Sequence, residues 1–206
     1  MRSSDQKIYL ASKSPRRREL LRQIGIEFEL LPLRDQASRN ADVSELFLPD
    51  ETAEEYVSRV ALEKADAGLQ IVRWRRLPPR PVLSADTSVV LDKIIFGKPT
   101  DQDEAIQMLR LLSGRTHQVL TSVAIRRDED TWQITQSSEV KFAELSDETI
   151  LAYCATNEPF DKTGAYGIQG IAAAFIEHIS GSYTGIMGLP LFETTQLLKL
   201  AGVKVL

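Results

Sequence analysis

The spacing of apolar residues near the N-terminus predicts a buried strand followed directly by a helix. Residues 7–12 form a short apolar run, and residues 20–24 carry apolar side chains at helical spacing. Ser14 suits the N-cap of this helix, and Pro15 suits its first position because proline lacks the N–H that a helix start leaves unbonded. Gly25 then favours the end of the helix.

A second helix is predicted further along the chain. Residues 28–33 form another apolar run that indicates a strand, and residues 34–51 show no regular pattern. The T-x-x-E motif at residues 52–55 is typical of a capping box, and apolar residues at helical spacing follow over residues 57–69. The prolines within residues 73–81 break the helix, because proline cannot continue one.

The central part of the chain alternates between strands and a helix. Residues 82–91 and 94–96 indicate a hairpin, and residues 100–114 have the acidic first turn and terminal glycine of a helix. Residues 117–125 and 131–142 alternate apolar and polar side chains, which predicts two antiparallel strands joined by a polar turn.

The C-terminal part adds two helices and one strand. Helices are predicted over residues 146–156 and 188–202, the second beginning at Pro190, and a strand over residues 170–179. Because hairpins are mixed with strand–helix units, we expect an α/β fold with a mixed sheet and flanking helices.

Composition limits the class of protein. The 206 residues are 43% hydrophobic, enough to bury the core of one domain. A net charge of −4 argues against general nucleic-acid binding, and no apolar run approaches the roughly 20 residues of a membrane span. Cys154 is the single cysteine, so no intramolecular disulfide can form. With no apolar segment typical of a secretory signal near the N-terminus, we expect a cytoplasmic protein.

Positive charge is concentrated where the first strand meets the first helix. Ser14, Arg16 and Arg17 lie at a helix start, where unpaired N–H groups and the helix dipole favour a bound anion. Cations at this end oppose the dipole unless an anion such as a phosphate is bound. The pattern indicates a phosphate site, with a solvated basic turn as the alternative.

Two further charged residues stand in apolar surroundings. Asp86 lies inside the apolar strand of residues 82–91, where an ionised carboxylate needs a compensating cation or donor. A metal or a catalytic role would supply the reason; the alternative is a place on the solvent face of an edge strand or at a turn. Lys64 lies on or beside the apolar stripe of its helix, where it either extends to water or meets a phosphate.

The remaining candidates lie in loops. Lys98 stands between Gly97 and Pro99, and residues 158–170 form a glycine-rich segment that carries Lys162 and Gln169. Each is also compatible with an ordinary turn or connection. Taken together, these cations and the acids Asp86, Glu45 and Asp161 describe a polyphosphate site that needs a divalent ion.

Several other chemistries are not indicated. His117 and His178 are too few and too isolated for a zinc site, and Cys154 fits a small core residue. Neither a Walker phosphate loop nor a G-x-S-x-G motif is present.

Four ordered blocks resemble the Maf family of nucleoside triphosphate pyrophosphatases. They are "LASKSPRRRELL" (10–21), "SADTSVVLDKIIFGKP" (84–99), "LSGRTHQVLTSVAI" (112–125) and "DKTGAYGIQGIAAAFIEHISGSYTGIMGLPL" (161–191). The resemblance covers nearly the whole chain, from Tyr9 to about Leu198.

The resemblance implies a fold like that of the inosine triphosphate pyrophosphatases. The whole chain, residues 1–206, would form one domain whose elongated mixed sheet carries two lobes around a central cleft. It also implies a reaction that needs a divalent cation, Mg²⁺ or Mn²⁺, and converts a nucleoside triphosphate and water to the monophosphate and pyrophosphate. A homodimer is expected from the family, and neither nucleic acid nor membrane is an expected partner.

The resemblance assigns roles residue by residue. Asp86 matches the catalytic acid, and Asp86 with Glu45 would hold the metal, although Ser44 replaces the aspartate that usually precedes this glutamate. The phosphate-binding set is matched by Ser14, Arg17, Lys64, Lys98 and Lys162. Arg16, Thr87 and Gln169 match the subfamily that acts on dTTP and UTP.

Two alternatives stay open at this point. The relatives that act on 7-methyl-GTP carry tryptophan in place of Arg16 and glutamate in place of Gln169. The family name comes from septum formation, so a nucleotide-sensing regulator of cell division is the competing class of function.

Overall fold

The structure, a computed structural model, describes residues 6–34 and 42–205. The chain divides into two compact units. The first unit comprises Met1–Asp86, Thr121–Gln136 and Gly188–Leu206, and the second comprises Thr87–Leu120 and Ser137–Met187.

Seven strands pair within the described residues, in the order β2-β1-β3-β5-β6-β7 with β4 on β3. Their bounds are β1 Ile8–Leu10, β2 Phe28–Leu30, β3 Val82–Leu91, β4 Ile94–Phe96, β5 Thr116–Arg127, β6 Asp130–Phe142 and β7 Ile176–Ser180. β1 pairs in parallel with β2 and β3, whereas β3–β4 and β6–β7 are antiparallel. The predicted α/β class with a mixed sheet is therefore confirmed.

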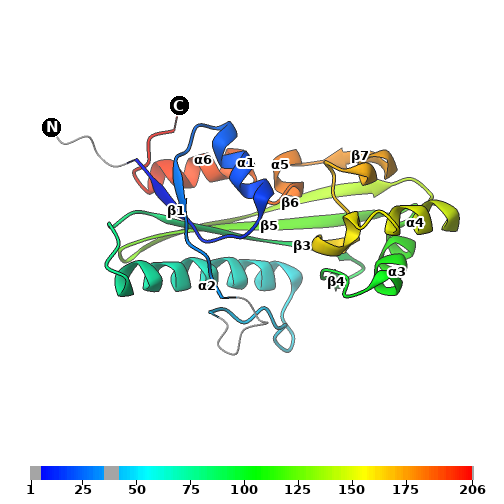
Figure 1. Ribbon diagram of the computed structural model, residues 1–206, viewed down its shortest axis with the longest axis horizontal. Coiled ribbons are helices and arrows are strands. Elements are labelled where there is room, and N and C mark those ends of the chain that lie inside the picture. Colours follow the sequence, from blue (N-terminus) through cyan, green and yellow to red (C-terminus); the bar gives the residue numbers. More distant parts are fainter. Residues whose placement is uncertain (1–5, 35–41, 206) are drawn as a thin grey trace. The chain divides into compact units, whose positions relative to one another are not determined.

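Three longer helices belong to the first unit: α1 (Pro15–Gln23), α2 (Ala53–Trp74) and α6 (Leu191–Leu200). In Figure 1, α2 runs along one face of the strands of this unit, and α1 and α6 lie on the other face. The predicted caps are present: the Ser14 hydroxyl accepts from Arg17 N, and Thr52 and Glu55 form a capping box. Local chemistry therefore fixes where both helices begin.

Small residues let α2 lie close to the strands. A Cβ added at Gly68 would lie 2.7 Å from Val82 Cγ1, so only glycine fits there without a shift. One and two turns earlier, Ala65 and Ala61 pack against Ala124 of β5. The buried Ser84 hydroxyl donates to Ala61 O at 2.5 Å, which fixes the helix against β3 two residues before Asp86.

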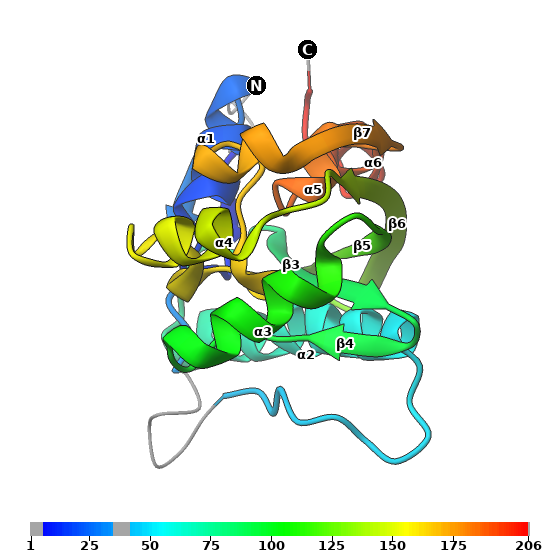
Figure 2. The ribbon, with the colours of Figure 1, turned by 90° about the vertical axis from the view of Figure 1, so that its right-hand side faces the viewer.

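The second unit contains α3 (Gln102–Leu112), α4 (Asp147–Cys154), α5 (Tyr183–Ile186) and three 3₁₀ segments: η1 Glu158–Asp161, η2 Thr163–Ala165 and η3 Ile171–Phe175. Figure 2 shows α3, α4, β4 and β7 of this unit toward the viewer. Edge-to-face contacts join the rings of His117, Phe142 and Tyr166 in its core. Cys154 is buried in the same core, as predicted, and burial raises the pKa of its thiol.

One predicted strand is partly wrong. Residues 171–175 form the 3₁₀ helix η3, and only Ile176–Ser180 is a strand. The cause is Glu158, whose carboxylate accepts from Ile171 N at 3.0 Å and Ala172 N at 3.5 Å and so caps the start of η3. A Cβ at Gly170 would lie 2.1 Å from a carboxylate oxygen of Glu158, so glycine makes room for this cap.

Among the described residues, no helix is both long and apolar enough to cross a membrane.

The buried His117 predicts a specific pH dependence of stability. Burial lowers its pKa to about 4, against an ordinary value of about 6.5. The unfolded chain therefore binds one more proton between these values, so stability is complete above about pH 6.5 and falls as the pH drops toward 4. The loss is about 3 kcal/mol at 1.36 kcal/mol per pH unit.

Urea unfolding of wild type and His117→Gln between pH 4 and 7.5 measures this term. The free-energy difference between the two proteins should shrink by about 3 kcal/mol toward pH 4. His178→Gln is the control, since His178 is exposed on β7. Parallel curves for wild type and His117→Gln would contradict the prediction.

Candidate active site

The turn from β1 into α1 is built from short hydroxyl side chains. The Ser12 hydroxyl accepts from Ser14 N at 3.2 Å and from Arg17 Nη1 at 3.2 Å. Arg17 Nε donates to the carbonyl of Gly188 at 2.7 Å. The Arg17 guanidinium is thus held between the β1–α1 turn and the residues that precede α6.

The three consecutive arginines have different surroundings. Burial lowers the pKa of Arg17, the charges of Asp86 and Glu45 raise it, and neighbouring Arg16 lowers it. Arg18 donates to the carbonyls of Ser14 and Lys13, a backbone role that the sequence did not indicate. Arg17 therefore belongs to the charge cluster of the first unit, together with the two acids.

The centre of that cluster is Lys64. Its Nζ lies 2.7 Å from Asp86 Oδ1 and 2.6 Å from Glu45 Oε1. Only 16% of the Lys64 side chain and 14% of the Asp86 side chain are exposed, against 45% for Glu45. The Lys64 ammonium therefore does not extend freely to water but forms ion pairs with two carboxylates. Neither of the two predictions made for Lys64 from the sequence included this pairing.

The burial of Asp86 argues against the solvent-face alternative. Only 14% of its side chain is exposed, and β3 lies between β1 and β5 in the order of the sheet. The parallel strand β1 ends beside β3, and α1 begins five residues after Leu10. Ligands of open α/β sheets bind at such carboxyl ends of strands, where helix starts supply N–H groups.

Five of the predicted site residues thus lie in the first unit. Glu45, Lys64 and Asp86 form one ion cluster, the charges of the two acids act on Arg17, and Ser14 caps the helix that carries Arg17. Arg16 follows Ser14 and Pro15 on α1, and its side chain is partly exposed.

The other four predicted residues belong to the second unit. Gly164 N donates to the carbonyl of Gly97 at 2.9 Å, which brings the Lys98 turn next to the Lys162 segment. Lys98 and Gln169 are exposed, and Lys162 Nζ contacts Glu158 O at 2.6 Å and Asp161 Oδ1 at 2.5 Å. Thr87 is partly exposed and directly follows Asp86 on β3.

The glycine-rich segment has one position that requires glycine for conformational reasons. Gly164 has φ of +73°, and a Cβ there would lie 2.9 Å from Val89 Cγ2. The positive φ turns the chain between Lys162 and Tyr166, and the close contact seats this turn on β3.

Glu45 and Asp86 fit a divalent cation by their chemistry. Two carboxylates converge on one positive centre, here Lys64 Nζ, and Mg²⁺ is commonly held by one or two carboxylates together with substrate phosphates. No group of three or more His, Cys, Asp or Glu side chains suited to a metal occurs among the described residues. Water or phosphate oxygens of a substrate would supply the remaining ligands of a cation held by these two carboxylates.

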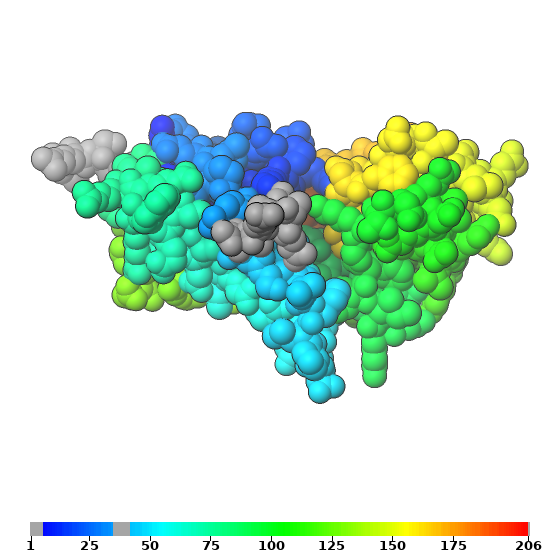
Figure 3. Space-filling view, turned by 60° about the horizontal axis from the view of Figure 1, so that its bottom comes forward, coloured from blue at the N-terminus to red at the C-terminus, as the bar shows by residue number. Residues whose placement is uncertain are grey.

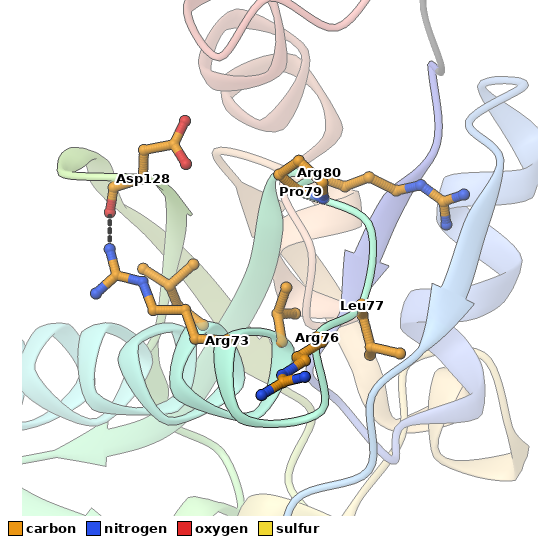
Figure 4. Close-up of a pocket in the computed structure, with 8 residues that line it drawn as sticks. Arg73, Arg76, Leu77, Pro79, Arg80 and Asp128 are labelled. Carbon is orange, nitrogen blue, oxygen red and sulfur yellow. Dashed lines mark hydrogen bonds between the residues drawn. The ribbon is translucent and has the colours of Figure 1, made fainter.

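A separate pocket of about 300 Å³ lies at the C-terminal end of α2. Arg73, Arg76 and Arg80 line it, but Figure 4 shows their side chains pointing apart, with Arg73 donating to Asp128 O. Lys64 precedes Arg73 by nine residues, or about 13 Å of helix. The pocket is thus neither a converging anion site nor part of the Lys64 cluster.

Sequence reasoning also missed residues that support the site. Arg59 contacts the segment around Glu45, Ser12 holds Arg17, and Glu158 organises the glycine-rich segment. Ser12 belongs to the "ASKS" stretch directly before the predicted helix start, so its contact with Arg17 could have been predicted from the sequence. Arg59 and Glu158 carry no such signal, because the contacts by which they support the site reach backbone groups 13–15 residues away.

The fold and the cluster together define an α/β protein with a cation-bridged pair of carboxylates at the carboxyl end of a parallel strand pair. The chain belongs to the Maf family: the family model described as Maf-like protein matches residues 7–201. This confirms the resemblance seen in the sequence.

Several relatives are similar over almost their full length. A protein of Aromatoleum aromaticum named dTTP/UTP pyrophosphatase is 56% identical over 98% of both chains. Proteins with the same name from Dechloromonas aromatica and Chromobacterium violaceum are each 52% identical, covering 97% and 96% of this chain and 100% and 96% of their own. The Ham1 protein of Staphylococcus aureus overlaps 67% of this chain and 72% of its own with a TM-score of 0.45 and 15% identity, a likeness too weak to carry an argument.

Replacing Lys64 tests whether its ammonium is what allows the two carboxylates to lie together. In Lys64→Met the pair loses its shared cation, and Asp86, whose side chain is only 14% exposed, keeps its desolvation cost without compensation. We expect this to lower stability by about 1–3 kcal/mol at neutral pH.

Unfolding in urea at neutral pH measures this deficit. Arg110→Met serves as the control, because Arg110 makes an exposed ion pair with Asp147 whose loss should change stability little. A deficit for Lys64→Met no larger than that of Arg110→Met would show that charge compensation is not its main contribution.

Proposed function

We propose that this chain hydrolyses nucleoside triphosphates, with dTTP and UTP as substrates, to the monophosphate and pyrophosphate. The observation that carries the proposal is the pairing of Asp86 and Glu45 through Lys64, beside the Arg17 guanidinium. Relatives at 50–56% identity named dTTP/UTP pyrophosphatase support the same reaction.

The first step is binding of the triphosphate. Arg17 and Lys64 offer cations in the first unit, and the start of α1 offers backbone N–H groups beside the Ser14 hydroxyl. We assign Lys98 and Lys162 of the second unit to the same phosphate-binding role. A polyphosphate that engages Lys64 frees the two carboxylates from their shared ion pair.

The chemical step is hydrolysis at the α-phosphorus. Asp86 orients a water molecule and accepts its proton, while the water oxygen bonds to phosphorus and the bond to the bridging oxygen breaks. Pyrophosphate leaves with the electron pair of that bond, and the surrounding cations stabilise its charge. Positioning and charge compensation supply most of the acceleration in such reactions.

Glu45 and Asp86 would also hold the divalent ion, Mg²⁺ or Mn²⁺. When bound, such an ion polarises phosphate oxygens and offsets the charge that develops on them. Apart from this contribution, the proposal relies on the side chains described above.

Arg16, Thr87 and Gln169 are the proposed determinants of the base. An amide both donates and accepts hydrogen bonds, which matches the carbonyl and imide edge of thymine or uracil. A 7-methylguanine base carries positive charge and would be favoured instead by an aromatic ring and a carboxylate. The combination in this chain therefore favours dTTP and UTP.

The test is a substrate panel with Asp86→Asn as the inactive partner. Pyrophosphate release from dTTP, UTP, dCTP, dATP, GTP and 7-methyl-GTP is measured with Mg²⁺ or Mn²⁺. Wild type should prefer dTTP and UTP, and Asp86→Asn should lose about 10²–10⁴-fold in kcat, since general-base catalysis contributes about that much.

Asp66→Asn is the matched control, because Asp66 lies on α2 in an ion pair with Arg126 outside the cluster. Its activity should match wild type. Tight triphosphate binding without pyrophosphate release in wild type would instead favour a nucleotide-sensing regulator, and activity near wild type in Asp86→Asn would remove Asp86 from the mechanism.

A double replacement tests the base determinants. Arg16→Trp with Gln169→Glu should lower kcat/KM for dTTP by at least about tenfold relative to 7-methyl-GTP, because the amide is replaced by an acceptor-only group. Arg18→Trp is the control for adding an indole ring to α1. If the melting temperature falls but the ratio of kcat/KM for dTTP to kcat/KM for 7-methyl-GTP is unchanged, these residues are structural.

A further inference from the structure

The segment before α2 is held by contacts that the reaction itself does not require. Residues 43–51 are mostly exposed, and Figure 3 shows the light-blue to cyan part of the chain projecting from the surface at this place. Leu46, Phe47 and Leu48 have exposed fractions of 68%, 51% and 52%. A segment with so few buried side chains cannot place Glu45 by packing alone.

Three consecutive carbonyls of this segment are bound by two side chains of α2. Tyr56 Oη donates to Glu45 O at 3.1 Å. Arg59 Nη1 donates to Ser44 O at 3.3 Å, and Arg59 Nη2 donates to Leu46 O at 2.9 Å. The carbonyls of Glu45 and of both its neighbours are thus fixed to one helix.

Acidic partners hold the Arg59 guanidinium in this orientation. Its Nε and Nη2 donate to Glu51 at 2.6 and 2.9 Å, and Nη1 also contacts Glu63 one turn further along α2. Hydrogen bonds to Glu51 and Glu63 raise the pKa of Arg59, while burial lowers it. Glu51 additionally accepts from Leu48 N at 3.1 Å, so the same carboxylate closes the segment behind Glu45.

The ring of Tyr56 also contacts the segment and Arg59. Its ring lies 4.2 Å from that of Phe47 between centroids, and the Arg59 guanidinium lies 5.6 Å from the Tyr56 centroid. Burial and the charges of Asp86 and Glu45 raise the pKa of Tyr56, so its hydroxyl keeps the proton that it donates.

We propose that Arg59 and Tyr56 are positioning residues that place the Glu45 carboxylate beside Lys64 and Asp86. This inference rests on the proposed function, because it gives the arrangement a purpose in pyrophosphate release. Lys64 lies five residues after Arg59 on the same helix, so α2 holds both the backbone of Glu45 and the cation that its carboxylate meets. The Ser58–Gln133 hydrogen bonds fix this part of α2 to β6.

The experiment compares wild type, Tyr56→Phe, Arg59→Lys, Glu45→Gln and the double variant Arg59→Lys/Glu45→Gln. Arg73→Lys is a matched control: Arg73 also lies on α2 and donates to one backbone carbonyl, Asp128 O, and to one carboxylate, Glu129. Pyrophosphate release from dTTP gives kcat and KM, and Mn²⁺ binding without nucleotide is followed by electron paramagnetic resonance.

We expect Arg59→Lys to weaken Mn²⁺ binding and lower kcat/KM by about 10–100-fold, the usual effect of losing an outer-shell partner of a metal ligand. Tyr56→Phe keeps the ring and loses one hydrogen bond, so about a 2–10-fold loss is expected. The double variant should be no worse than Glu45→Gln, because both changes act through one carboxylate. Arg73→Lys should match wild type.

Cleavage by chymotrypsin gives a readout that does not depend on activity. Release of residues 44–46 should raise the rate of cutting after Phe47 at least several-fold in Arg59→Lys and Tyr56→Phe, with little change in Arg73→Lys. This measurement also serves if Arg59→Lys folds poorly, because Tyr56→Phe removes a single oxygen.

The outcomes separate the two proposals. Losses in Arg59→Lys and Glu45→Gln that multiply in the double variant, or unchanged cleavage at Phe47 in both positioning variants, overturn the inference. If wild type releases no pyrophosphate from any triphosphate, the proposed function fails, and the cleavage rates then decide alone whether Arg59 and Tyr56 hold Glu45.

Discussion

The arrangement depends on one ammonium group placed between two carboxylates. Lys64 Nζ lies within 2.7 Å of oxygens from both Asp86 and Glu45, and two of these three side chains are largely shielded from water. Two acids so close together and partly desolvated repel each other strongly without a cation. The first unit can therefore hold a concentrated negative charge only by keeping a positive centre at the same place.

The position of that positive centre follows from backbone packing. Gly68, Ala65 and Ala61 bring α2 close to the strands, and the Ser84–Ala61 hydrogen bond sets the register between helix and strand. Lys64 is then directed at Asp86 because both residues lie within three positions of that bond. A larger side chain on this face of α2 would move the helix, and the distance between ammonium and carboxylate would increase with it.

Features of the fold and the site could be predicted from the sequence where the interacting residues are close together along the chain. The start of α1 was predictable because Ser14, Pro15 and Arg17 are neighbours, and the capping box of α2 was predictable for the same reason. Residues 171–175 were misassigned because Glu158, more than ten residues earlier, captures their N–H groups. The ion pairs of Lys64 and the hydrogen bonds of Arg59 to Ser44 and Leu46 could not be predicted either, since no local pattern reports contacts with groups distant in sequence.

The Arg34–Asp42 contact has a consequence for how the chain can vary. Arg34 donates to the Asp42 carboxylate from its backbone N and from its guanidinium, at 2.7–2.9 Å, and Asp42 N donates to Arg34 O at 3.2 Å. These bonds lower the pKa of Asp42, so the junction persists at neutral pH. Because Arg34 and Asp42 are tied together three residues before Glu45, their contact sets where the chain resumes its course toward Glu45. The approach to the acid therefore depends on keeping both side chains, one at position 34 and the other at position 42.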